Sequence, residues 1–248
     1  MKKERIDLLL VSRGMVESRA KAQALIMSGQ VFLDENHANK VLKAGEMVCE
    51  KQPLFLKEKL PFVSRSGQKL KGAIDKFKIQ LKDLSVLDVG ASTGGFTDCV
   101  LSEGAKKVYA LDVGKALLDY RLTKDLRVEV IENCNFRYVE VSKFKGKIDF
   151  ITIDVSFISL EHILPNAFEI LSNNGGLVAL VKPQFEVGKG KTVKGIVKDR
   201  EAREEVLKKI ISFSEKLGFK FIESMEATVK GTKGNIESLI YLRKEQGI

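Results

Sequence analysis

Residues 86–101 consist of an apolar run, a turn of small residues and a helix-forming segment, in that order. The run 86–89 is apolar apart from Asp88 and suits a buried parallel strand. The turn that follows reads G-x-x-x-G-G, from Gly90 to Gly95. Because glycine lets a ligand approach the backbone and the start of a helix offers free N–H groups, this unit predicts a nucleotide-cofactor site.

Two features of this turn favour S-adenosylmethionine over a dinucleotide. The dinucleotide fingerprint G-x-G-x-x-G needs glycine at position 92, where this chain has serine. Asp88 at the strand end suits a ligand with positive charge, such as the amino acid and sulfonium of S-adenosylmethionine, better than an anionic pyrophosphate. The residues that we expect to contact this cofactor are Asp88, Gly90, Ser92, Gly94, Gly95 and Phe96.

Strands and helices alternate from residue 64 onward. The further strands that the sequence predicts are 107–112, 128–131, 149–154, 176–181, 219–224 and 238–243. Such alternation predicts an α/β domain with a doubly wound, Rossmann-like sheet whose ligands bind at the carboxyl ends of the strands. Asp112 ends the second strand and is expected to take the cofactor ribose hydroxyls. Asn135 follows the third strand, where it could contact the adenine edge or be an ordinary loop asparagine.

The charge balance points to a polyanionic partner. The chain has 42 Lys and Arg against 33 Asp and Glu, a formal net charge of +9. Nucleic acid is the first partner to expect, with an anionic membrane surface as the rival. No apolar run approaches the roughly 18–20 residues of a membrane span. Three scattered cysteines form neither a zinc spacing nor a disulfide framework, so we expect a cytoplasmic protein without a metal.

The first 50 residues have the pattern of a small separate module. Short helices are expected at 5–11 and 19–27, the second with Ser18 as its N-cap, and short strands follow at 31–33 and 47–49. The motifs R-x-D from residue 5, S-R-x-K-A from residue 18 and I-x-x-G from residue 26 make this module resemble the S4 RNA-binding domain.

The S4 resemblance implies that basic side chains on the helix pair neutralise RNA phosphates. A helical hairpin with a solvated charged face is the alternative. The residues that we expect to bind RNA in this module are Arg5, Arg13, Arg19 and Lys21.

Four charged residues stand where a doubly wound sheet has its active site. Lys69 opens a helix, Asp154 and Lys182 end neighbouring strands, and Glu237 precedes the last strand. The apolar run before Lys182 is unusual for a surface lysine. A desolvated lysine beside a second cation can serve as a base, and carboxylates can orient it. Each residue alone would be an ordinary surface charge, but their joint placement favours catalysis.

With these four residues, the second domain resembles the FtsJ-type ribose 2′-O-methyltransferases. An S4 domain fused ahead of such a domain resembles the TlyA family, also labelled haemolysin A, and the segments S-R-S-G-Q-K-L from residue 64, D-V-S-F-I-S-L from residue 154, K-P-Q-F-E from residue 182 and G-N-I-E-S from residue 234 are typical of it. The chain departs from the FtsJ pattern at Asn135, where those enzymes carry aspartate. We expect an S4-like domain over 1–58, a linker over 59–63 and the methyltransferase domain over 64–248.

The resemblance implies an enzyme that methylates cytidine 2′-hydroxyls in ribosomal RNA, in the 23S rRNA of the large subunit and with the 16S rRNA as a second candidate. Lys69, Asp154, Lys182 and Glu237 would be its catalytic residues. Further RNA contacts are expected from Arg65 and from the glycine-spaced basic loop of Lys189 and Lys191. The expected partners are ribosomal RNA and ribosomal subunits, and the protein is expected to be a monomer.

Two other classes of function remain open from the residues. A membrane-active haemolysin would need a span, a barrel pattern or a strongly amphipathic apolar helix, and the sequence has none of these patterns. An S4 RNA-binding protein without activity would not need the four charged residues. Base methylation is disfavoured because Asp154 is followed by Val-Ser-Phe and not by the Pro-Pro pair of amino-methylating enzymes.

Overall fold

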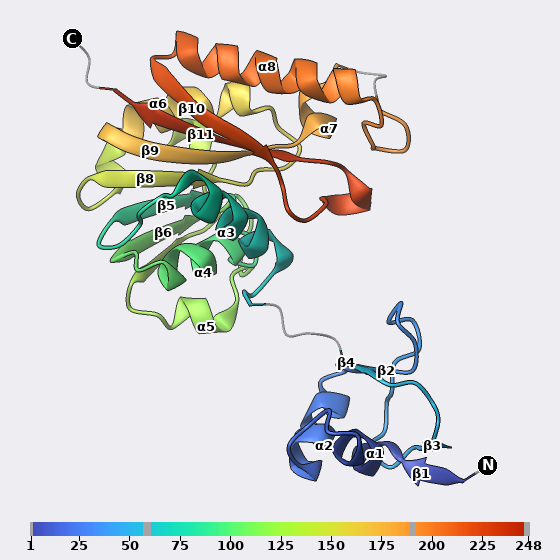
Figure 1. Ribbon diagram of the computed structural model, residues 1–248. Helices are drawn as coiled ribbons and strands as arrows, with labels where there is room; N and C mark the ends of the chain where they lie inside the picture. Colours follow the sequence, from blue (N-terminus) through green and yellow to red (C-terminus); the bar gives the residue numbers. More distant parts are fainter. Residues whose placement is uncertain (1, 57–60, 189–191, 246–248) are drawn as a thin grey trace. The chain divides into compact units, whose positions relative to one another are not determined.

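A computed structural model of the chain describes residues 2–56, 61–188 and 192–245 (Figure 1). The chain divides into two compact units, Met1–Lys59 and Leu60–Ile248.

The N-terminal unit is built from two short helices and two small antiparallel sheets. Its elements are β1 (Lys3–Arg5), α1 (Ile6–Ser12), α2 (Arg19–Met27), β2 (Val31–Phe32), β3 (Met47–Cys49) and β4 (Phe55–Leu56). Strand β1 pairs with β3, and β2 pairs with β4. The Ser18 side chain accepts a hydrogen bond from the Lys21 N–H, which confirms the expected N-cap of α2. The apolar faces of α1 and α2 meet in a core that includes Ile6, Leu10 and Ile26.

The larger unit contains a seven-stranded, mostly parallel sheet. Its strands are β5 (Ser85–Val89), β6 (Lys107–Leu111), β7 (Val128–Ile131), β8 (Ile148–Ile153), β9 (Leu171–Val181), β10 (Phe219–Glu226) and β11 (Ser238–Lys244). They lie in the order β10-β11-β9-β8-β5-β6-β7, and only the pairs of β11 are antiparallel. All the strands that the sequence predicts are present, and β9 and β10 are longer than expected.

Helices cover both faces of this sheet (Figure 1). They are α3 (Arg65–Phe77), α4 (Gly95–Ser102), α5 (Tyr120–Thr123), α6 (Leu164–Ile170), α7 (Pro183–Glu186) and α8 (Arg200–Lys216), with short 3₁₀ helices η1 (Phe136–Tyr138), η2 (Val141–Lys143), η3 (Leu160–His162) and η4 (Thr232–Gly234). Side chains of α3 and α4 form one apolar cluster with Val86, and those of α6 and α8 form another with Leu87. Neighbouring strand residues therefore face opposite layers, which confirms the doubly wound architecture.

The segment between the units is shorter than expected. We expected residues 59–63 to be a linker, but Phe62 and Val63 pack against the α3–α4 apolar cluster. The Val63 N–H also donates to the Asp98 carboxylate at 2.8 Å, in the first turn of α4. Burial of these two apolar side chains against the helix pair is more favourable than their exposure to water in a linker. Residues 62 and 63 therefore belong structurally to the larger unit.

Candidate active site

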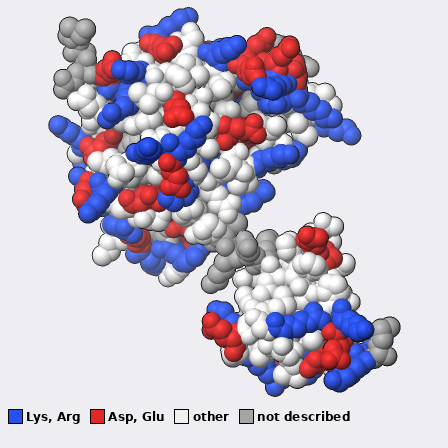
Figure 2. All heavy atoms as spheres, viewed as in Figure 1, with Lys and Arg blue, Asp and Glu red and all other residues white. Residues whose placement is uncertain are grey.

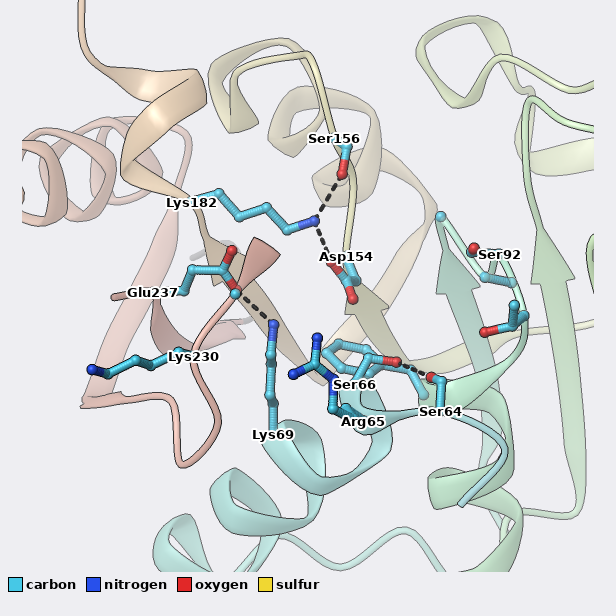
Figure 3. A pocket seen from close by; sticks show the side chains of 15 residues that line it. Ser64, Arg65, Ser66, Lys69, Ser92, Asp154, Ser156, Lys182, Lys230 and Glu237 are labelled. Carbon is cyan, nitrogen blue, oxygen red and sulfur yellow. Dashed lines mark hydrogen bonds and ion pairs between the residues drawn. The ribbon is translucent and has the colours of Figure 1, made fainter. Parts of the chain in front are cut away.

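The four charged residues singled out in the sequence come together at one edge of the sheet. Parallel strands β8 and β9 end side by side, which places Asp154 next to Lys182. Strand β11 runs antiparallel to β9, and its first residue, Ser238, pairs with Val181. This register brings Glu237 beside Lys182, while Lys69 reaches the same pocket from α3 (Figure 3).

Two lysines of this pocket, Lys69 and Lys182, each form an ion pair with one carboxylate. The Nζ atom of Lys182 lies 2.6 Å from Oδ1 of Asp154 and 2.9 Å from Oγ of Ser156. The Nζ atom of Lys69 lies 2.6 Å from Oε2 of Glu237. The Lys69 and Glu237 side chains are only 9% and 2% exposed, so their pair is almost fully withdrawn from water. Opposite charges at this distance fix the direction in which each ammonium points.

The pocket as a whole carries an excess of positive charge. Its described lining contains Lys69, Lys182, Lys230 and Arg65 against the two carboxylates of Asp154 and Glu237. Two formal positive charges therefore remain after the ion pairs are counted. Such a pocket favours an anionic substrate, and the phosphate groups of a nucleic acid meet that requirement.

A second hollow, of about 440 Å³, adjoins the lysine pocket on the side of β6. Its walls are largely apolar, and Asp112, Asn135, Val113, Leu117 and Phe136 are among the residues that form them. Gly90, Ser92, Asp154 and Ser156 line both cavities, so the two share a wall. A largely apolar slot with the Asp112 carboxylate in its wall suits an adenosine, whose base is flat and whose ribose donates hydrogen bonds.

Asp112 is held in place by the loop that it faces. Its carboxylate accepts hydrogen bonds from the Ser92 N–H at 2.8 Å and from the Gly114 N–H at 2.7 Å. Each carboxylate oxygen has a second lone pair, which leaves acceptors for ribose hydroxyls. S-adenosylmethionine fits this pair of cavities: Asp112 and the apolar slot would hold its adenosine, and the lysine pocket lies beyond the shared wall.

Of the glycines in the turn, Gly90 is the one that the site itself requires. Its φ of +83° favours glycine, and a Cβ there would lie 2.6 Å from the Asp154 carbonyl oxygen. Gly94 and Gly95 line neither cavity. A Cβ at Gly94 would collide with Leu122, and one at Gly95 with Ser66. These two glycines allow close packing, and their expected contact with the cofactor stays a prediction, whereas Ser92 and Phe96 line the lysine pocket.

Asp88, whose expected contact with the cofactor stays a prediction, has its side chain turned into the core. It is fully buried and lines neither cavity. Its carboxylate accepts hydrogen bonds from Oγ1 of Thr97 at 2.6 Å and from Oγ1 of Thr152 at 3.0 Å. Burial raises the pKa of Asp88 to about 7, against the lowering effect of these hydrogen bonds. Alternation along β5 turns this side chain toward α4, so it anchors that helix beneath the loop.

An aromatic residue that was not expected from the sequence lies beside the lysine pocket. Phe157 is 90% exposed and has a φ of +64°, and its ring centroid lies 5.0 Å from that of Phe185. It lines a third hollow that also includes Lys182 and Glu237. Only 7% of the residues are aromatic and none is tryptophan, but one well-placed ring is enough for base stacking. The available signal was a large apolar residue directly after Asp154-Val155-Ser156.

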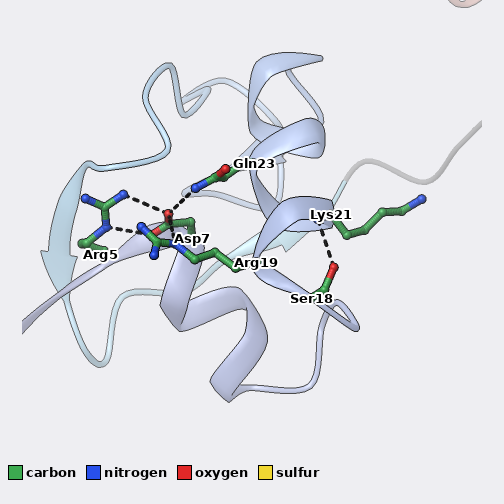
Figure 4. A network of polar contacts seen from close by, with 6 residues as sticks. All are labelled: Arg5, Asp7, Ser18, Arg19, Lys21 and Gln23. Carbon is green, nitrogen blue, oxygen red and sulfur yellow. Dashed lines mark hydrogen bonds and ion pairs between the residues drawn. The ribbon is translucent and has the colours of Figure 1, made fainter.

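In the N-terminal unit, two of the expected RNA-binding arginines converge on one carboxylate (Figure 4). Asp7 is fully buried and accepts hydrogen bonds from Arg5 at 3.0 and 2.9 Å, from Arg19 at 2.9 Å and from Gln23 at 3.0 Å. The hydrogen bonds from Arg5 hold the pKa of Asp7 far below its ordinary value. Lys21 points away from this network into solvent.

Arg13 forms hydrogen bonds with the backbone of its own unit. It donates to the carbonyl oxygens of Gln52 at 2.8 Å and Glu50 at 2.5 Å, which ties α1 to the segment after β3. Figure 2 shows Lys and Arg side chains spread over the visible face of each unit among acidic ones. Lys189 and Lys191 lie outside the described residues, and Arg65 lines the lysine pocket.

The fold and the paired cavities together define an S-adenosylmethionine-dependent methyltransferase preceded by a small RNA-binding module. A family model of the FtsJ-like methyltransferases matches residues 62–244, and one of the S4 domain matches residues 4–48. The chain belongs to the TlyA family, in which an S4 domain precedes an FtsJ-like methyltransferase.

Similar proteins match along nearly the whole chain. YqxC of Bacillus subtilis is 47% identical over 97% of this chain and 86% of its own length. The 16S/23S rRNA (cytidine-2′-O)-methyltransferase TlyA of Mycobacterium tuberculosis is 36% identical over 98% of this chain and 91% of its own. A solved structure from Streptococcus thermophilus, which carries a hemolysin name, has a TM-score of 0.77 and 43% identity, and covers 100% of this chain and 90% of that one. In the described part of the chain, no helix is long and apolar enough to cross a membrane.

Proposed function

We propose that this protein transfers a methyl group from S-adenosylmethionine to the 2′-hydroxyl of a cytidine in ribosomal RNA. The substrate would be the 23S rRNA of the large subunit, with the 16S rRNA as a second substrate. The observation that carries this proposal is the pocket of two lysine–carboxylate pairs that shares a wall with the adenosine-sized hollow. The name of the Mycobacterium tuberculosis relative supports the choice of cytidine and of ribosomal RNA.

The two lysines would have different tasks at the ribose. Bound S-adenosylmethionine supplies an electrophilic methyl group on its sulfonium. Lys182, oriented by Asp154 and Ser156, either accepts the 2′-hydroxyl proton as the neutral amine or, as the ammonium, favours loss of that proton to solvent. The 2′-oxygen attacks the methyl carbon in line as the methyl–sulfur bond breaks. Lys69, oriented by Glu237, positions the ribose and stabilises the developing alkoxide. Proton transfer of this kind contributes about 10²–10⁴-fold, and positioning of the two substrates adds to it.

Residues around the ion pairs would hold the RNA. Arg65 and Lys230 supply the positive charge left in the lysine pocket and would contact phosphates next to the target nucleotide. The exposed ring of Phe157 offers a face on which an unstacked base can lie. In the S4 unit, Arg19 and Lys21 are exposed and would contact phosphates elsewhere on the RNA.

The test is transfer of labelled methyl groups to purified ribosomal subunits. Wild-type protein should label rRNA, and the labelled position should resist alkaline cleavage because its 2′-oxygen is methylated. Lys182→Ala should abolish transfer and retain cofactor binding. Lys220→Ala is the matched control, because it removes a lysine that is 60% exposed on β10. Label on a base, or no label on either subunit or on free rRNA, would refute the proposal.

A further inference from the structure

Glu186 is a buried carboxylate close to the lysine pocket that the proposed reaction does not use. It is the last residue of α7, four positions after Lys182, and it is 8% exposed. Its Oε2 accepts a hydrogen bond from Oγ of Ser159 at 2.5 Å, and its Oε1 accepts one from the Leu160 N–H at 2.9 Å. Both carboxylate oxygens are therefore engaged by the same short stretch of chain.

These hydrogen bonds join the segments that follow two adjacent parallel strands. Ser159 and Leu160 follow β8, and Glu186 follows β9. We name residues 155–160 the β8 loop. At its start, the Asp154 N–H donates to the Val89 carbonyl oxygen at 2.9 Å, in the sheet. The β8 loop is thus fixed at one end by the sheet and at the other by Glu186.

The β8 loop carries the side chains that border the reaction site. Ser156 contacts Lys182 and lines the lysine pocket, the adenosine-sized hollow and the hollow beside Phe157. Phe157 has a φ of +64°, a strained conformation that persists only where the surroundings hold it. Movement of this loop would therefore change all three cavities at once.

Burial of the Glu186 carboxylate carries a desolvation cost that an apolar side chain at this position would not have. Burial raises the pKa of Glu186, and the hydrogen bonds from Ser159 and Leu160 act in the opposite direction. Lys209 also favours the charged form, although its own ion pair, at 2.6 Å, is with Glu161. A buried charge of this kind is tolerated where its hydrogen bonds fix a geometry that apolar contacts would leave loose.

We propose that Glu186 is a positioning residue for methyl transfer, which clamps the β8 loop so that Ser156 and Asp154 hold Lys182 at the reacting ribose. Glu186 itself touches no substrate. The inference rests on the proposed function, because its effect is expressed as the rate of that reaction.

The experiment compares four single variants and one double variant of the full chain. Glu186→Ala removes both acceptors and should lower kcat about 100-fold, since a misplacement of about 1 Å can cost that much. Glu186→Gln keeps one acceptor oxygen, and Ser159→Ala removes one donor; each should lower kcat about tenfold. Glu161→Ala is the matched control, because it removes a carboxylate from the same turn that pairs only with Lys209 in the described structure, and it should retain wild-type kcat.

The readouts separate positioning from folding. In the four single variants we expect the KM for RNA to stay within about twofold of the wild-type value, because Arg65 and Lys230, which are proposed to contact phosphates, lie outside the β8 loop. Adding Ser159→Ala to Glu186→Ala should lower kcat no further, because the two residues share one hydrogen bond. The melting temperature is measured beside kcat, and if Glu186→Ala does not fold, Glu186→Gln and Ser159→Ala carry the test.

Folded Glu186 variants with wild-type kcat would overturn the inference, as would a loss confined to RNA or cofactor affinity. A wild-type protein that transfers no methyl group to rRNA would overturn the proposed function and this inference with it. The two failures are distinguishable because the wild-type protein is assayed in the same series.

Discussion

The buried ion pair of Lys69 and Glu237 allows the stability of the site to be separated from its activity. In the described structure, Glu237 is the residue with which Lys69 forms an ion pair, and both side chains are nearly withdrawn from water. We consider three variants: Glu237→Leu, Lys69→Met and the double variant that carries both. Each single variant leaves one charge buried without its partner, and the double variant replaces both charges by apolar side chains of similar size.

The expected cost follows from the exposure of the two side chains. Side chains that are 9% and 2% exposed have lost nearly all their hydration, and removing one partner of a buried pair costs about 3–5 kcal/mol. Two independent losses would add to roughly 6–10 kcal/mol. Because the double variant has no unpaired buried charge, we expect it to lose less stability than either single variant. The free energy of coupling between the two positions should therefore be several kcal/mol.

The measurement is urea unfolding of the wild-type protein and the three variants, followed by methyl transfer to ribosomal subunits. Stability should be recovered in the double variant, and transfer should not, because Lys69 is absent. Additive losses of stability would show that the pair is not coupled. Transfer by the stable double variant at the wild-type rate would refute the role that we propose for Lys69.

Three further perturbations follow from the structure. The pKa of Asp88 is about 7 in the folded protein against an ordinary 3.8, so between these pH values the folded protein binds more protons than the unfolded chain. The free energy of unfolding should therefore fall by on the order of 4 kcal/mol as the pH rises from about 4 to above 7. Asp88→Asn should remove this pH dependence in urea unfolding, and an unchanged dependence would contradict the assignment. Gly231→Ala would place a Cβ against the carboxylate of the buried ion pair and should reduce transfer at least about tenfold. Gly188→Ala should not, because among the described residues no atom beyond its chain neighbours lies within 4 Å of the added Cβ; equal activity of the two variants would count against the geometry. Arg19→Ala should weaken RNA binding and reduce the slope of log K for RNA against log salt concentration by about one. Arg13→Ala should mainly lower the melting temperature. The reverse result would assign RNA binding to Arg13 and a structural role to Arg19.

Much of the site was predictable because it depends on topology. The carboxyl ends of neighbouring parallel strands meet at one edge, so Asp154 and Lys182 could be expected to lie together from their positions in the sequence. The turn after β5 marked the cofactor loop in the same way. The position of Glu237 depends on the register between β11 and β9. The sequence indicated where the last strand begins but not which residues of β9 it pairs with.

The features that the sequence did not reveal are tertiary. The burial of Asp88 was not predicted because alternation along one strand does not say which layer faces the cofactor. The close packing of Gly94 and Gly95 was not predicted because their close neighbours come from other segments. Phe157 was not expected because the aromatic content of the whole chain is low, and a composition says nothing about a single position. Hydrogen-bond partners such as those of Glu186 form only when two loops meet.

The identity of the methylated nucleoside tests the central claim most directly. Ribosomal subunits labelled by the wild-type protein would be digested to nucleosides and separated by chromatography with mass detection. The account predicts that the label is found in 2′-O-methylcytidine, and that Lys182→Ala leaves this nucleoside unlabelled. Label in a base-methylated nucleoside, or in a ribose-methylated nucleoside other than cytidine, would contradict it.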